Sequence, residues 1–176
     1  MQNGTYSFGF AHDLSVAGGR TSLRAGRALA QRTATFDGSL GLVRFDSGTI
    51  APIATLAYTQ ALPRDASFQI SLDQSVATTL EDRNSLRTLL AASYSRPINR
   101  VSNWSVNTSL ARIDVVGTTD GDATRADFGV NYNRSLTADW QLAVGLQAQR
   151  GFQANSSVSR SNILSANVRR SFSFRP

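Results

Sequence analysis

The stretch from residue 127 to residue 147 decides the fold. It reads DFGVNYNRSLTADWQLAVGLQ, two alternating segments around a turn. In both segments every second side chain is large and apolar: Phe128, Val130, Tyr132, Trp140, Leu142, Val144 and Leu146. Alternation with period two is typical of β-strands that have two different faces. The stretch therefore predicts a β-hairpin whose strands are joined by residues 136–139.

The same alternation recurs along the whole chain of 176 residues. It predicts ten strands, near residues 4–16, 20–31, 34–45, 49–62, 66–79, 85–96, 103–114, 124–135, 139–152 and 161–174. They are longer than the usual strand of about 5–6 residues, and a tilted strand crosses a bilayer with about 9–11. No linker or change of composition divides the chain, so we expect one domain over residues 1–176, an all-β, antiparallel up-and-down transmembrane β-barrel.

The predicted connections fall into two alternating sets, one for each end of the sheet. The first set comprises residues 32–33, 62–65, 97–100 and 136–139, and the second comprises 17–19, 46–48, 81–84, 117–122 and 155–159. Most carry Gly, Pro, Asn or Asp, the residues that favour turns. In the longest of them, residues 117–122, the Asp and Gly residues match no calcium-binding spacing, so we interpret them as turn residues.

The composition excludes several kinds of chemistry. The chain has no cysteine, one histidine (His12) and one glutamate (Glu81), so disulfides, thiolate sites and histidine-rich metal sites are not expected. His12 lacks a second group that would act with it in general acid–base catalysis. We therefore predict no catalytic residue, no metal and no cofactor, and we do not expect an enzyme.

The net charge is +6, and all 18 basic residues are arginine, since lysine is absent. These arginines are scattered along the chain and form no single stripe, so we do not expect nucleic acid as a partner. Six of them fall near turns of the second set, where guanidinium groups would meet lipid phosphates: Arg20, Arg44, Arg83, Arg112, Arg125 and Arg160.

The aromatic residues share one position in the repeating pattern. Each of nine lies a few residues from a chain end or from a turn of the first set: Tyr6, Phe36, Tyr58, Phe68, Tyr94, Trp104, Tyr132, Trp140 and Phe172. Because strand direction reverses each time, these side chains would form one ring at one end of the sheet. Aromatic girdles of this kind lie at the membrane interface of barrels, whereas a soluble core would not confine them to one end.

The alternate positions are small and polar, which suits the wet lumen of a barrel better than a soluble core. We expect nine polar residues to face the lumen: Asp13, Arg24, Asp73, Arg87, Asn107, Asp127, Asn131, Gln147 and Arg169. Arg27 and Gln74 break the pattern, because unbroken alternation puts them on the lipid face. A β-bulge in the second strand would re-aim Arg27.

With this alternation, hairpin order and C-terminal strand, the chain resembles the bacterial outer-membrane β-barrel family over nearly its whole length. The resemblance implies an outer-membrane location, contact with the lipid bilayer and lipopolysaccharide, and periplasmic termini. It also implies that the outer-membrane assembly machinery reads Phe172 and Phe174 as an assembly signal. Arg170 on the outward face and the final Arg175-Pro176 depart from the family pattern.

The function expected from this pattern is a narrow, weakly selective passive pore for small solutes or ions, since ten strands lie near the closed end of the barrel series. One alternative is the C-terminal membrane anchor or export barrel of a larger surface-display or polysaccharide-export protein. The chain enters a strand pattern at once, which favours an excised domain or a mature form. A second alternative is a soluble all-β binding module.

Overall fold

The computed structural model describes residues 3–15, 18–78, 84–115, 122–153 and 158–171. These residues form ten strands and confirm the all-β prediction. The strands are β1 (Asn3–Ser15), β2 (Gly18–Ala30), β3 (Ala34–Phe45), β4 (Ile50–Leu62), β5 (Ala66–Thr78), β6 (Asn84–Asn99), β7 (Ser102–Val115), β8 (Ala123–Ser135), β9 (Trp140–Gln153) and β10 (Ser159–Arg170). In the described part of the chain, no helix is long and apolar enough to cross a membrane.

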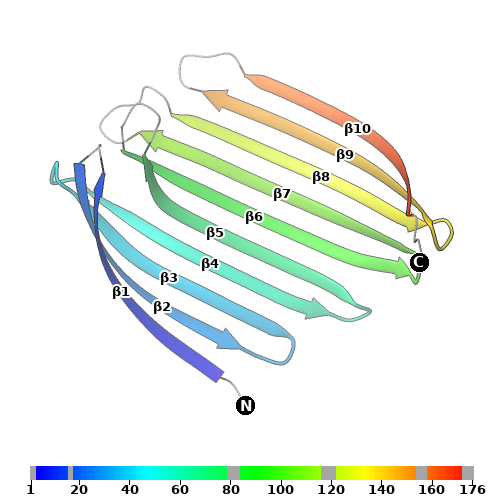
Figure 1. Cartoon of the computed structure of the whole chain (residues 1–176), viewed down its shortest axis with the longest axis horizontal. Coiled ribbons are helices and arrows are strands. Elements are labelled where there is room, and N and C mark those ends of the chain that lie inside the picture. Colours follow the sequence, from blue (N-terminus) through cyan, green and yellow to red (C-terminus); the bar gives the residue numbers. More distant parts are fainter. Residues whose placement is uncertain (1–2, 16–17, 79–83, 116–121, 154–157, 172–176) are drawn as a thin grey trace, which may run out of the picture.

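The strands form one sheet in which each strand pairs with its neighbours in the sequence, in the order β1 to β10. Every pairing is antiparallel, which confirms the predicted up-and-down topology. Among the described residues no pairing joins β1 to β10, so these two strands are the edges of a curled, open sheet (Figure 1). The predicted closure into a barrel is therefore not seen in the sheet itself.

The largest differences from the predicted strand boundaries are at the ends of two strands: β10 ends at Arg170 and not at residue 174, and β6 extends beyond residue 96. The turn predicted over residues 97–100 is wrong in part, because β6 continues to Asn99, which pairs with Ser102. The register shifts between Pro97 and Asn99, as in a β-bulge. Ile98 is the residue left without a ladder partner, and Pro97, which has no N–H to donate, pairs with Asn103 at the edge of this bulge, where a proline is tolerated.

Two turns depend on left-handed backbone. Arg64 and Asp65, between β4 and β5, have φ angles of 63° and 56°. Asp is one of the few residues besides glycine that adopt this region readily, whereas Arg is uncommon there. Gly48, between β3 and β4, has a φ of 81°, which a residue with a Cβ rarely adopts.

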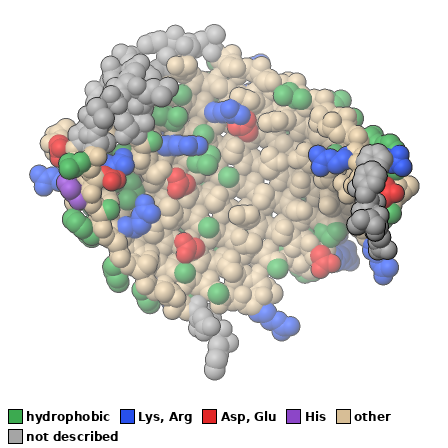
Figure 2. All heavy atoms as spheres, viewed as in Figure 1, with side chains coloured by type: hydrophobic (Ala, Val, Ile, Leu, Met, Phe, Trp, Pro, Cys, Tyr) green, Lys and Arg blue, Asp and Glu red, His purple; other side chains and the backbone are tan. Residues whose placement is uncertain are grey.

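The pairing register assigns every paired residue to one of two faces. We call the face that carries Tyr6, Leu72 and Leu110 the apolar face, and the face that carries Asp13, Asp73 and Asn107 the polar face. Figure 2 shows the polar face, on which backbone and uncharged polar atoms predominate, with scattered Arg and Asp side chains and few apolar ones. The alternation in the sequence has therefore produced a two-faced sheet.

A small apolar cluster interrupts the polar face at the β3–β4 turn. Its buried members come from the end of β3 and the start of β4: Val43, Phe45, Ala51 and Ile53. Val76 and Leu86 pack against it, although the alternation places them on the apolar face. The pairing of β4 with β5 ends at Ala54 and Gln74, whereas β5 and β6 stay paired to Thr78 and Asn84, so this end of the β5–β6 hairpin is not held to β4.

Candidate functional site

The strands are staggered across the sheet. One unbroken row of paired residues runs through all ten strands: Tyr6, Arg27, Gly38, Leu56, Leu72, Leu90, Leu110, Ala126, Arg150 and Arg160. The row starts near the beginning of β1, at the end of the sheet where the first set of turns lies. It finishes near the beginning of β10, at the opposite end. A sheet must be staggered in this way before it can close into a barrel.

Large apolar side chains are exposed over the apolar face. Those that the structure leaves exposed on it are Tyr6, Phe8, Phe10, Leu14, Leu23, Leu40, Leu42, Ile50, Leu90, Leu110, Phe128, Trp140, Leu146, Phe152, Leu164 and Val168. Phe8 is 84% exposed and Leu164 76%. Among the paired residues of the described strands, the exceptions on the polar face are Ile113 and Ile163. Soluble monomers rarely expose contiguous apolar patches larger than a few hundred Å².

Eight of the nine aromatic residues predicted to form a ring lie in the described strands, and all eight are on the apolar face, each toward the first set of turns. Phe172, the ninth, and Phe174 of the predicted assembly signal lie outside the described residues. Tyr94 and Trp104 form a tilted ring pair with centroids 5.3 Å apart. Such pairs attract each other beyond the area that they bury.

Two arginines on the apolar face lie over rings of this group. The guanidinium carbon of Arg27 is 5.0 Å from the centroid of Tyr6, and that of Arg170 is 5.4 Å from the centroid of Trp140. The expected bulge at Arg27 is wrong, because the pairing of β2 runs without a shift from Arg20 to Ala30. The ring face, rather than a change of side, accommodates this charge.

All nine residues predicted to face a lumen lie on the polar face. Two of the nine, Asp13 and Asp127, form ion pairs with arginines on the same face. Arg20 contacts Asp13 at 3.1 Å, and Arg125 contacts Asp127 at 2.8 Å. In total this face carries the carboxylates Asp13, Asp37, Asp73 and Asp127 and the guanidinium groups Arg20, Arg24, Arg87, Arg125 and Arg169. The two signs of charge are therefore nearly balanced on this face.

Amide side chains cover the half of the polar face that β7 to β10 form. Asn131 donates to Asn107 at 3.3 Å, and Asn133 donates to Asn103 at 3.2 Å. Glycines make room for the first pair, since a Cβ on Gly129 would lie 2.8 Å from the Asn107 amide. A Cβ on Gly145 would lie 2.9 Å from the Asn131 oxygen. The sequence shows these residues, but only the register shows that each glycine faces an amide.

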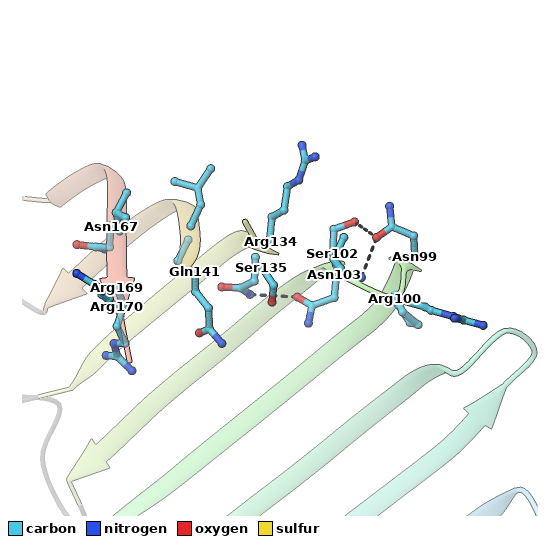
Figure 3. A pocket seen from close by; sticks show the side chains of 16 residues that line it. Asn99, Arg100, Ser102, Asn103, Arg134, Ser135, Gln141, Asn167, Arg169 and Arg170 are labelled. Carbon is cyan, nitrogen blue, oxygen red and sulfur yellow. Dashed lines mark hydrogen bonds between the residues drawn. The ribbon is translucent and has the colours of Figure 1, made fainter. Parts of the chain in front are cut away.

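A polar hollow of about 970 Å³ lies at the end of this amide-covered half, beside the β6–β7 and β8–β9 turns. Two adjacent rows form its floor. Asn103, Asn133, Ala143 and Asn167 are successive partners across β7 to β10, and Ser135, Gln141 and Arg169 form the next row. In Figure 3, Gln141 and Asn103 extend to one side of the sheet, whereas Arg134 extends to the other. Arg134 is nevertheless one of the residues that line the hollow, together with Arg100 and Arg170.

Three of the six arginines predicted for the rim form ion pairs within the protein. Arg20, Arg112 and Arg125 each contact an aspartate, with Arg112 2.7 Å from Asp114. Arg44 and Arg160 lie on the apolar face, and Arg83 is outside the described residues. His12 hydrogen-bonds through Nδ1 with the Thr21 hydroxyl at 2.9 Å. In the described part of the chain, no group of three or more His, Cys, Asp or Glu side chains is placed to hold a metal ion.

No protein-family model, curated protein or solved structure matches this chain in the three comparisons made with known proteins.

Proposed function

We propose that this chain is an outer-membrane β-barrel that forms a narrow, weakly selective passive pore. The observation that carries the proposal is the apolar face, which exposes large side chains on nearly every strand. Water makes such a surface costly, at about 25 cal/mol for each Å² of apolar area, and acyl chains remove that cost. The opposite face, with its balanced charges and amides, suits contact with water in a lumen.

Closure of the sheet is part of the proposal, because an open edge inside a bilayer leaves backbone groups without partners. The stagger supports a specific register. Eight-stranded barrels with a shear of eight have a strand tilt near 36°. Keeping the same ratio of shear to strand number gives a ten-stranded barrel a shear of about ten. The row that begins at Tyr6 ends at Arg160, so a shear of ten places Tyr6 beside Arg170, ten positions along β10. Phe8 then lies beside Val168, and both are on the apolar face.

The aromatic ring supports the orientation of this barrel. Rings with arginines over them fit the membrane interface, where an apolar body lies against acyl chains and a cation lies near phosphates. We therefore propose that Tyr6, Trp140 and the other rings of this group lie at one interface. Arg27 and Arg170 would lie at that level and not at the bilayer midplane, where a charge costs about 2–4 kcal/mol.

The lumen determines the expected conductance. Eight strands leave an interior that side chains fill, and sixteen leave an aqueous channel, so ten leave a narrow bore. Four carboxylates and five guanidinium groups on the polar face give little preference for either sign of ion. We expect small single-channel steps in planar bilayers, with similar permeability for potassium and chloride. Absence of steps from protein that has inserted into the bilayer contradicts the pore.

The apolar cluster on the polar face favours a second candidate. Val43, Phe45 and Ile53 lie where the bore would open at the end of the second set of turns. An apolar constriction excludes water and blocks conduction. The chain would then be a closed membrane anchor, which inserts into vesicles and resists alkaline extraction but gives no conductance steps.

A further inference from the structure

The polar hollow at the end of β6 to β10 has the chemistry of a binding site for a small solute. Amide side chains line it, among them those of Asn103, Asn133, Gln141 and Asn167, and each offers both a donor and an acceptor. Among the described residues, no Asp or Glu lines it. All the strands that line it are between β6 and β10, and no described residue of β1 is among the lining residues.

Three polar side chains in the hollow are available to a ligand. Within the described residues, the side chains of Gln141, Asn167 and Arg169 make no hydrogen bond or ion pair, whereas the side chains of Asn103 and Asn133 bond to each other. Gln141 and Arg169 are direct cross-strand partners. Asn167 is on the same face two positions from Arg169, next to the small side chain of Ala143. The guanidinium group of Arg169 thus has two amide side chains without a protein partner near it, Gln141 across the strand pair and Asn167 two residues before it.

We propose that this hollow binds a small anionic, hydroxyl-rich solute of the sugar-acid class. Arg169 would pair with the carboxylate, for which the planar guanidinium has matching geometry. Gln141 and Asn167 would exchange hydrogen bonds with the hydroxyls, since an amide can both donate to and accept from a hydroxyl. Among the described residues no carboxylate lines the hollow, so the charge of Arg169 has no partner among them.

Titration of the full chain in zwitterionic detergent with three probes tests the chemistry. The probes are glucuronate, neutral glucose and inorganic phosphate. Glucuronate supplies both the charge and the hydroxyls, so it should bind about tenfold more tightly than either of the others. Equal binding of glucose removes the role of Arg169, and equal binding of phosphate removes the role of the amides. Either result overturns the proposal.

Two arginines at the same end of the sheet provide a matched pair of variants. Arg169→Gln should weaken glucuronate binding about tenfold, because it removes a charge inside the hollow. Arg96→Gln makes the same charge change on the apolar face, at a residue that does not line the hollow, and should alter binding less than about twofold. Equal losses from both variants mean that only general electrostatic attraction operates, which overturns the site.

A third variant covers the case in which Arg169→Gln does not fold. Gln141→Leu keeps the charge and removes one amide, and it should weaken glucuronate binding while leaving phosphate binding unchanged. If Gln141→Leu weakens the binding of neither glucuronate nor phosphate, the amide row has no role in binding, which overturns this part of the proposal. Binding in detergent is measured without a membrane, so glucuronate binding without conductance contradicts the pore alone, and conductance without glucuronate binding contradicts the hollow alone.

Discussion

The guanidinium carbon of Arg27 lies 5.0 Å from the centroid of the Tyr6 ring, and the two residues are direct partners across β1 and β2. Both are on the face that exposes large apolar side chains, and Tyr6 is itself 64% exposed. A lone charge there would conflict with a lipid environment. The contact with the ring instead resolves the exception that Arg27 makes to the sequence pattern.

This contact predicts a measurable coupling between the two residues. Tyr6→Leu and Arg27→Gln, made singly and together, should give a coupling free energy of about 0.5–1 kcal/mol in reversible urea unfolding. Arg24, on the polar face, provides the control. The changes in unfolding free energy caused by Arg24→Gln and Tyr6→Leu should add within about 0.3–0.5 kcal/mol. Additivity of Arg27→Gln with Tyr6→Leu would show that the ring does not stabilise this charge.

A charge introduced on the apolar face distinguishes a membrane surface from a solvent-exposed one. Leu110 is 45% exposed, and Ser109 beside it faces the other way. In phospholipid vesicles Leu110→Arg should lower the free energy of unfolding by about 2–4 kcal/mol if its position is in the acyl region. Ser109→Arg should cost much less, because its side chain faces the proposed lumen. A cost within about 0.5 kcal/mol for Leu110→Arg is the value for a soluble surface and would refute the membrane location.

Phe45 links stability to the width of the proposed bore. Its side chain is only 3% exposed, within the cluster on the polar face. Phe45→Ala should destabilise the protein by about 3–5 kcal/mol and enlarge single-channel conductance, because it removes bulk from the polar side of the sheet. Phe45→Leu preserves most of the volume and should cost less than about 1.5 kcal/mol. If the alanine variant loses stability without any change in conductance, the cluster does not narrow the pore.

Cysteine pairs test closure directly, since the chain has no native cysteine. In membrane-inserted protein, Phe8→Cys with Val168→Cys should form a disulfide on mild oxidation, because direct cross-strand partners have Cα atoms about 4.5–5.5 Å apart. Phe8→Cys with Leu164→Cys should not, as four residues along a strand add about 13 Å. Mass spectrometry after alkylation reports both. Equal yields, or cross-linking only between molecules, would contradict a closed barrel with this register.

Much of the fold follows from local patterns in the sequence. The alternation around the turn at residues 136–139 led to the hairpin of β8 and β9, whose strands the structure places at Ala123–Ser135 and Trp140–Gln153. Prediction was poorer at Pro97, where a bulge allows β6 to continue to Asn99. The residue itself suggested a turn, and the continued pairing with β7 outweighed that local preference.

The features of the candidate sites were harder to predict. Val43 and Phe45 have the opposite parity to Leu40 and Leu42, so the sequence already showed apolar residues on the polar side. That they pack with Ile53 depends on the β3–β4 register. The row of Gln141 and Arg169 depends likewise on how β9 and β10 align.

The sequence by itself determined the number of strands, their order as hairpins and the two faces, because alternation is a property of each strand alone. Only the tertiary structure decided the register, the stagger and the neighbours of each charge. A backbone ladder forms equally well after a shift of two residues, and such a shift keeps every side chain on its face. Side-chain packing and turn geometry determine which of these registers forms. The register that forms places Arg27 over the Tyr6 ring and Arg169 beside Gln141.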